Sequence, residues 1–311
     1  MTKQATRDAY GKALVALGAE NKDIVVLDAD LSKSTKTAEF AKNYPERFFN
    51  MGIAEANLMG TAAGLAAAGK IPFASTFAIF ATGRAFEQIR NSIAYPKLNV
   101  KIAATHSGVS VGEDGGSHQA VEDIAIMRAM PNMTVLVPAD GEETKQAIYA
   151  AAKYDGPVYI RMGRLGVPLL FDENYKFEIG KANVVREGED CTIFANGLMV
   201  AEAMEAAKEL EEEGIKVAVV NVASVKPLDR ETIISYAKKT KAVVTAEEHN
   251  IIGGLGSAVA EVLSEEAPTP IVRIGIKDTF GESGRPLELL EKYGLTKEDV
   301  KAGVKAVIKK K

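Results

Sequence analysis

Short runs of β-branched and apolar residues alternate along this chain with longer stretches of helical composition. This alternation limits the fold more than any other feature, because strands separated by helices are typical of βαβ units, whose parallel sheet is covered on both faces. The sequence therefore predicts an α/β first domain with a mostly parallel sheet. Its expected strands lie at residues 23–27, 100–104, 133–137 and 158–161.

The pattern lapses between residues 166 and 190, where Pro168, Gly180 and several charged residues interrupt it, as is typical of a linker. We therefore expect a first domain over residues 1–170, a linker over 171–187 and a second, smaller α/β domain with a mixed sheet over 188–311. The elements expected in the second domain are a helix at 199–213 and strands at 191–195, 215–220, 242–245 and 271–274.

The composition argues against several classes of protein. The 311 residues are 47% hydrophobic, enough for sizeable cores, and a net charge of −4 with interspersed signs offers no basic field to nucleic acid or to a membrane surface. The lone cysteine, Cys191, cannot form an internal disulfide, and no apolar run reaches the roughly 18 residues of a membrane span. Residues 1–10 lack the apolar core of a signal peptide. We expect a cytoplasmic protein that binds neither nucleic acid nor membranes.

Glu55 stands among small and apolar residues in the run Met51-Gly-Ile-Ala-Glu-Ala-Asn-Leu-Met-Gly60. A charge is costly to bury there without a partner. Acids also favour the first turn of a helix, where N–H groups are unsatisfied. From the residues alone, Glu55 is either a helix-capping carboxylate or a catalytic one.

A glycine-rich loop follows the strand expected at 100–104 and carries His106 and His118, two of the three histidines, together with Glu113 and Asp114. Ligands of parallel sheets bind beyond the carboxyl ends of the strands, so this loop is a candidate active-site loop. The alternative is a surface loop with solvated acids. The two histidines lack the close spacing of a helical metal pair, and no cysteine is nearby.

Two aromatic residues, Phe77 and Phe80, lie three positions apart in the segment Ser75-Thr-Phe-Ala-Ile-Phe80. Spacing alone favours core packing for both. A further glycine-rich segment, Gly253-Gly-Leu-Gly256, precedes a helix and suggests a phosphate site or, since the full dinucleotide spacing is lacking, a tight turn. The nearby His249 is interpreted as a loop or interface histidine.

Together these segments resemble transketolases, which are thiamine diphosphate enzymes. The resemblance covers nearly the whole chain and implies a parallel-sheet pyrimidine-binding domain of the thiamine diphosphate-binding fold, followed by a smaller α/β transketolase C-terminal domain. Deoxyxylulose phosphate synthase and the beta subunits of 2-oxoacid dehydrogenases share the Gly-Ile-Ala-Glu segment. The further segments typical of transketolase are Val111-Gly-Glu-Asp-Gly-Gly-Ser-His-Gln119, Leu136-Val-Pro-Ala-Asp140, Phe280-Gly-Glu-Ser-Gly284 and Leu289-Leu-Glu-Lys-Tyr-Gly294.

The resemblance implies roles in cofactor binding for four residues. Glu55 would hydrogen-bond a ring nitrogen of the aminopyrimidine of thiamine diphosphate and so take part in catalysis. Phe77 and Phe80 would form its stacking surface, and Asp30 would lie beside the cofactor. Transketolases commonly carry another aromatic residue where this chain has Gly83.

The resemblance also implies the residues that meet the sugar phosphate. Asp114 and His118 would contact sugar hydroxyls near the reacting carbons and act in catalysis, and His106 would line the channel toward the phosphate. The phosphate itself would be bound by Ser34 and Arg164, with Arg161 as the alternative arginine.

One motif of the family is missing. Thiamine enzymes hold the diphosphate and a divalent metal, Mg²⁺ or Ca²⁺, through a Gly-Asp-Gly motif, which this sequence does not contain. The resemblance therefore implies the C-terminal subunit of a two-subunit transketolase of the pentose phosphate pathway. It would self-associate, join an N-terminal subunit in an α2β2 assembly, and transfer a glycolaldehyde unit from a ketose phosphate to an aldose phosphate. The alternatives are a 2-oxoacid dehydrogenase beta subunit, a deoxyxylulose phosphate synthase-like half and a non-catalytic assembly subunit.

Overall fold

Strand β2 (Ile24–Asp28) shows why the first half of the chain forms a layered α/β unit. All five of its residues are buried, because successive side chains of a strand point to opposite faces and helices cover both faces. Val25 and Leu27 join the apolar core on one face, and Ile24 and Val26 join the core on the other. A continuous apolar run is therefore the sequence signature of a strand in the middle of such a sheet.

The computed structural model, which describes residues 2–311, places β2 in a seven-stranded sheet with the order β12-β6-β7-β5-β4-β2-β3. Neighbours run parallel except β12, which is antiparallel to β6, so the predicted mostly parallel sheet is confirmed. The bounds are β3 (Phe48–Asn50), β4 (Ile71–Phe77), β5 (Lys101–Thr105), β6 (Thr134–Leu136), β7 (Val158–Arg161) and β12 (Ser224–Lys226).

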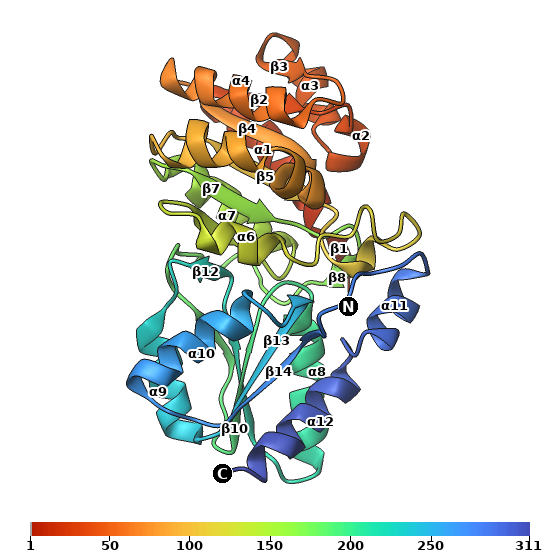
Figure 1. The fold of residues 1–311 in the computed structure, drawn as a ribbon, viewed down its shortest axis with the longest axis vertical. Helices are drawn as coiled ribbons and strands as arrows, with labels where there is room; N and C mark the ends of the chain where they lie inside the picture. Colours follow the sequence, from red (N-terminus) through yellow and green to blue (C-terminus); the bar gives the residue numbers. More distant parts are fainter. Residues whose placement is uncertain (1) are drawn as a thin grey trace.

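Helices cover both faces of this sheet (Figure 1). One face packs against α1 (Thr6–Glu20), α3 (Ala38–Asn43) and α7 (Gly141–Lys153), and the other against α4 (Glu55–Ala67) and α6 (Asp123–Ala129). Short helical turns complete this half: α2 (Ser32–Thr35), η1 (Pro45–Arg47), α5 (Phe86–Gln88), η4 (Val109–Val111) and two π-helical turns, η2 (Phe80–Arg84) and η3 (Ile89–Ala94).

The second half forms a five-stranded sheet with the order β14-β13-β10-β11-β9. It is mixed, as predicted, because β9 runs antiparallel to β11 while the other neighbours are parallel. β9 (Asn183–Arg186) falls within the expected linker; its half-exposed edge position gives little hydrophobic signal. The other strands are β10 (Cys191–Ala195), β11 (Val217–Asn221), β13 (Val243–Asn250) and β14 (Ile271–Ile276).

Helices α8 (Met199–Glu212) and α12 (Lys297–Ile308) cover one face of the second sheet, while α9 (Arg230–Thr240) and α10 (Leu255–Glu266) cover the other (Figure 1). The short α11 (Pro286–Lys292) lies against η4 of the first half. Within residues 2–311, no helix is long and apolar enough to cross a membrane.

Two strand pairings lie beside the boundary between the halves. β12 comes from the second half of the chain but completes the edge of the first sheet, where Lys226 Nζ donates to the carbonyls of Arg128 and Met130 at 2.9 and 2.6 Å. β1 (Lys3–Ala5) pairs antiparallel with β8 (Gly166–Pro168), so the start of the chain lies against the end of the first domain. The two halves are therefore joined by more than a covalent linker.

Glu143 is a buried carboxylate at this boundary. Its Oε1 accepts hydrogen bonds from Tyr175 Oη at 2.6 Å and Asn221 Nδ2 at 2.7 Å, and its Oε2 accepts from the Ala139 amide at 2.6 Å. Burial raises the pKa of Glu143 to about 7. This carboxyl group thus connects the first sheet, the linker and the second sheet.

Candidate active site

The carboxyl ends of three adjacent strands carry residues that the sequence predicted for the site. Asp30 follows β2, Phe77 ends β4 and His106 follows β5, and the sheet order β5-β4-β2 makes these ends neighbours. Asp30 and His106 have positive φ angles of 62° and 57°, which residues with side chains rarely adopt. Such backbone conformations cluster at functional sites, and ligands of parallel sheets bind beyond the carboxyl ends of the strands, so this edge of the sheet is the candidate site.

Glu55 is the first residue of α4, and its side chain is only 7% exposed. Its Oε1 accepts a hydrogen bond from Arg84 Nη1 at 2.8 Å. The Arg84 guanidinium carbon in turn lies 3.9 Å from the centroid of the Phe80 ring. The buried charge is therefore paired, through a residue that the sequence analysis did not single out.

Phe77 and Phe80 are buried and stack with their centroids 5.7 Å apart, outside the two apolar clusters that pack on the first sheet, and they form a wall of rings. The His106 ring stacks on Phe77 at 3.8 Å, and the edge of His118 meets Phe80 at 5.1 Å. The structure thus brings both histidines of the glycine-rich loop against the aromatic pair.

His106 is a buried histidine held between two partners. Arg7 Nη1 lies 3.0 Å from its Nε2, and Thr105 Oγ1 lies 2.8 Å from its Nδ1. Because a guanidinium can only donate, the hydrogen-bond network assigns Nε2 as the acceptor and places the proton on Nδ1. Burial first, and then the positive charges of Arg7 and Arg164, lower the pKa of His106 to about 3, so the ring is neutral at physiological pH.

Arg7 is a second residue that the sequence analysis missed. Its Nη1 also donates to the carbonyl of Ser34 at 3.1 Å, whereas its buried Nε has no hydrogen-bond partner within the described residues. Burial lowers the pKa of Arg7. The position of Arg7 could have drawn attention to it, because Arg7 puts a positive charge in the first turn of α1, where the helix dipole disfavours cations. An unsatisfied buried N–H of a guanidinium suits an anionic ligand.

Arg164 and Arg161 have different environments. Arg164 is part-exposed, donates from Nη1 to the Val111 carbonyl at 2.8 Å and lies 3.6 Å from Asp114 Oδ2. Arg161 is buried, and its Nε donates to Asp123 Oδ2 at 2.8 Å while its Nη2 donates to backbone carbonyls. The geometry therefore leaves Arg164 available to a ligand and commits Arg161 to a buried ion pair.

The segment that carries Asp30 and Ser34 is organised by Asp28, which was not singled out from the sequence. The buried Asp28 carboxylate accepts from the Leu31 amide and the Thr35 hydroxyl, both at 2.6 Å, and burial raises its pKa. Asp28 thus fixes the turn after β2, in which Asp30 is exposed and Ser34 is part-buried.

The glycine-rich segment before α10 is filled by the chain itself. Glu247 accepts from the amides of Leu255 and Gly256, both at 2.7 Å, so a carboxylate already occupies the start of this helix. His249 is fully buried and accepts at Nε2 from the Ala125 amide of the first half, at 3.3 Å. The tight-turn interpretation is therefore correct, the phosphate-site alternative is wrong, and His249 is an interface histidine.

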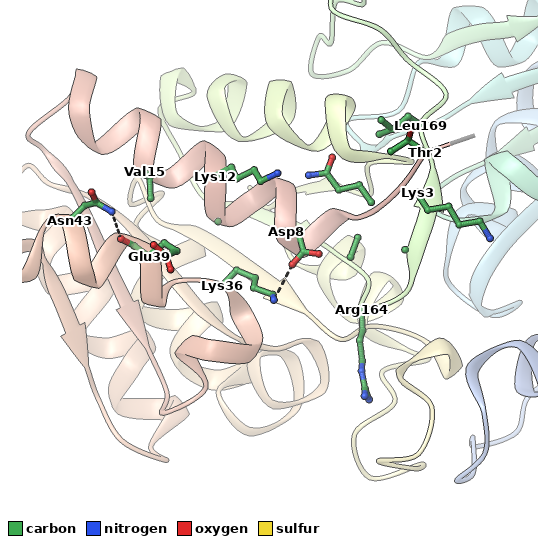
Figure 2. Close-up of a pocket in the computed structure, with 14 residues that line it drawn as sticks. Thr2, Lys3, Asp8, Lys12, Val15, Lys36, Glu39, Asn43, Arg164 and Leu169 are labelled. Carbon is green, nitrogen blue, oxygen red and sulfur yellow. Dashed lines mark hydrogen bonds and ion pairs between the residues drawn. The ribbon is translucent and has the colours of Figure 1, made fainter.

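Figure 2 shows a cavity of about 920 Å³ beside α1 and α3, to which Arg164 is the only contributor among the predicted site residues. The Arg164 side chain extends away from the Asp8–Lys36 pair, whose charged atoms lie 3.1 Å apart. The cavity is lined by four cationic side chains, Lys3, Lys12, Lys36 and Arg164, and by two acidic ones, Asp8 and Glu39, so its net charge is positive. Neither Glu55 nor the Phe77–Phe80 pair lines it. Within residues 2–311, no cluster of three or more His, Cys, Asp or Glu side chains could hold a metal ion.

Comparison with known proteins identifies the family. The model described as "Transketolase, pyrimidine binding domain" matches residues 2–168, and the one described as "Transketolase, C-terminal domain" matches residues 180–300. The chain belongs to the transketolase family. Within that family it corresponds to the C-terminal section, which contains the pyrimidine-binding and C-terminal domains.

Three similar proteins support this placement. A protein of Methanocaldococcus jannaschii described as "Putative transketolase C-terminal section" is 54% identical over 308 residues, covering 98% of this chain and 96% of its own. A 6-deoxy-6-sulfo-D-fructose transketolase subunit of Clostridium sp. is 45% identical over 305 residues, covering 98% and 95%. The solved structure described as "Split gene transketolase, inactive beta4 tetramer" has a TM-score of 0.92 and 64% identity, and covers 98% of both chains.

Proposed function

We propose that this chain is the C-terminal subunit of a two-subunit transketolase, which transfers a two-carbon glycolaldehyde unit from a ketose phosphate to an aldose phosphate with thiamine diphosphate. The observation that carries this proposal is the buried carboxylate of Glu55 beside the Phe77–Phe80 wall. Arg7 lies next to His106, which stacks on Phe77 of the same wall. One sheet edge thus offers an aromatic cofactor surface and a cationic end.

The residues present fit the aminopyrimidine of thiamine diphosphate. Glu55 already accepts a hydrogen bond from the planar guanidinium of Arg84, whose carbon lies over the Phe80 ring. An aminopyrimidine with a protonated ring nitrogen would present the same N–H to this carboxylate. When bound, thiamine diphosphate supplies the nucleophilic carbon that takes up and releases the two-carbon unit. Glu55 would hold a proton at the pyrimidine nitrogen, and Phe77 and Phe80 would orient the ring and exclude water.

The other side chains would act on the sugar phosphate. Asp114 and His118 would meet its hydroxyls near the reacting carbons, and Arg7, Arg164 and Ser34 would bind its phosphate end. His106, neutral and fixed by Arg7, would line the channel between them without bringing a positive charge to the reacting carbons.

The diphosphate and its divalent metal, Mg²⁺ or Ca²⁺, would be bound by an N-terminal subunit. The absence of a Gly-Asp-Gly motif in this sequence supports this division of the site. We propose an active α2β2 assembly and an inactive, self-associated state of this chain alone. The similar split-gene structure, described as an inactive β4 tetramer, supports the second state.

Reconstitution tests the proposal. The chain would be coexpressed with an N-terminal transketolase section from the same genome, and ketose-to-aldose transfer would be measured with and without thiamine diphosphate. We expect transfer only with both subunits and the cofactor. Full activity of this chain alone would overturn the proposal, as would transfer that needs no cofactor.

The ketoses tested as two-carbon donors should include 6-deoxy-6-sulfo-D-fructose, because one relative is named for it. Release of carbon dioxide from pyruvate would instead indicate a 2-oxoacid dehydrogenase or deoxyxylulose phosphate synthase activity. A complex that assembles but catalyses nothing would indicate the non-catalytic assembly subunit.

A further inference from the structure

Arg84 occupies an unusual position beside the proposed cofactor surface. It ends the π-helical turn η2, which begins at Phe80, and its side chain is 53% exposed. From there the guanidinium returns over the Phe80 ring and donates to Glu55 Oε1 at 2.8 Å. One exposed side chain thus contacts both groups that the aminopyrimidine would need.

The distance between Arg84 and Phe80 leaves no room for a further ring. The guanidinium carbon lies 3.9 Å from the ring centroid, which is an ordinary van der Waals contact. A heterocycle between them would require about twice that separation, because each of its faces needs a contact of roughly 3.5 Å. A ring that stacks on this face of Phe80 and reaches Glu55 must therefore displace Arg84.

The rest of the Phe80 ring is taken by other rings. Phe77 stacks against it at 5.7 Å, and the edge of His118 meets it at 5.1 Å. Arg84 is the only one of these neighbours that is a flexible and half-exposed side chain. Gly83, which precedes it, adds no side chain that would fix it in place, since even an added Cβ would meet only Ile79, at 3.9 Å.

We propose that Arg84 is an internal competitor of the aminopyrimidine of thiamine diphosphate, taking the same carboxylate oxygen and the same aromatic face. Its guanidinium imitates the heterocycle because both are planar groups that stack on aromatic rings and, once the ring nitrogen of the aminopyrimidine carries a proton, both donate an N–H to the carboxylate. Arg84 moves aside when the cofactor binds, so this residue sets the affinity of the pyrimidine half of the site. The inference rests on the proposed function, since it requires that this chain bind the cofactor.

The expected effect is moderate, because a half-exposed ion pair and a cation–π contact are both weak. Removing Arg84 should tighten cofactor binding by roughly 3- to 30-fold. Arg84→Ala would be compared with Arg90→Ala, which removes an exposed arginine whose described side-chain hydrogen bond is to Asn91. The dissociation constant of thiamine diphosphate would be measured by titration calorimetry on the assembled two-subunit complex.

A second readout needs no partner subunit. Binding of 4-amino-5-hydroxymethyl-2-methylpyrimidine, the aminopyrimidine fragment, to the full chain alone would be followed by ligand-observed NMR. We expect Arg84→Ala to bind the fragment more tightly than the wild type does and Arg90→Ala to be unchanged. Equal thermal midpoints of the variants would show that the fold is intact.

The outcomes separate the two proposals. In the first outcome, the complex binds the cofactor and Glu55→Gln weakens that binding, whereas Arg84→Ala does not tighten it. Weaker binding by Arg84→Ala would make Arg84 a wall of the site, and unchanged binding would leave it without a role there. Either result refutes Arg84 as a competitor and leaves the proposed function standing. If neither the wild-type nor the Arg84→Ala complex binds thiamine diphosphate, the proposed function itself fails.

Discussion

A glycine-rich segment follows one strand in each sheet of this protein, β5 in the first and β13 in the second, and the two segments are used in opposite ways. In the second sheet, β13 leads to a glycine-rich turn whose helix amides are bound by the buried carboxylate of Glu247. In the first sheet, β5 leads to His106, whose φ is 57°, and the buried Nε of Arg7, the α1 residue that contacts His106, has no partner within residues 2–311.

The difference shows how to tell a structural turn from a binding turn. Buried polar groups are nearly always satisfied, so a turn whose groups are paired inside the chain serves stability. A turn that keeps a strained backbone and has an unpaired donor beside it carries a cost to stability that a ligand can offset. The glycines alone do not distinguish the two cases, whereas the hydrogen bonds do.

Glu55 and Glu247 provide the sharpest test of this comparison, because both are buried carboxylates near the start of a helix. In the assembled complex, Glu55→Gln should lower transfer activity by roughly 10²- to 10⁴-fold, since it removes the proton-holding group. The thermal midpoint and the assembly, measured by calorimetry and size-exclusion chromatography, should change little. Wild-type activity of this variant would remove Glu55 from catalysis.

Arg161 and Arg164 lie three residues apart and provide a second comparison between a structural and a binding residue. Arg161→Leu should lower the free energy of unfolding by about 3–5 kcal/mol, because it leaves the Asp123 charge buried without its partner. Arg164→Leu should leave stability nearly unchanged and raise KM for a phosphorylated sugar by about 10- to 100-fold. Urea unfolding and transfer kinetics with phosphorylated and unphosphorylated acceptors would separate the two. A KM effect equal for both acceptors would argue against phosphate binding by Arg164.

Glu247→Gln should affect stability alone. The amide can accept only one of the two helix hydrogen bonds, so we expect a loss of about 1–2 kcal/mol in the free energy of unfolding. The transfer rate per assembled complex should be retained. A large loss of activity at full assembly would contradict the division between a structural and a binding turn.

The smallest effect concerns the boundary between the sheets. Because the pKa of Glu143 is about 7 in the fold and 4.5 ordinarily, the folded state keeps a proton that the unfolded state releases. The stability from protonated Glu143 is present in full below pH 4.5 and is lost as the pH rises to about 7. Glu143→Gln should therefore flatten this dependence, by on the order of 1–2 kcal/mol between about pH 5 and pH 8 in urea unfolding. An unchanged slope would show that Glu143 is ionised in the fold.

The sequence predicted those parts of the fold that depend on continuous local patterns. The strands expected at 158–161 and 191–195 have these bounds, and the mixed second sheet is present. Strand β4 was not predicted as a strand, because Pro72 and three hydroxyl or small residues, Ala74, Ser75 and Thr76, hide its pattern. The crossing of β12 into the first sheet has no local signature.

The sequence predicted the site residues that belong to a recognisable motif, and it missed those that reach the site only through contacts between distant positions. Phe77, Phe80, His106 and His118 were expected together and lie together. Arg84 contacts Glu55 across 29 positions and Arg7 contacts His106 across 99, so neither partnership can be read from spacing. Their roles as binding residues stay predictions for the experiments above.

The position of β12 has a practical consequence for anyone who would express the halves separately. A fragment that stopped before Ser224 would bare the outer backbone groups of β6, which pair with β12 in the intact chain. An uncovered strand of this kind is a template for intermolecular pairing, so such a fragment should aggregate. Dissection of this protein therefore calls for point substitutions rather than truncation.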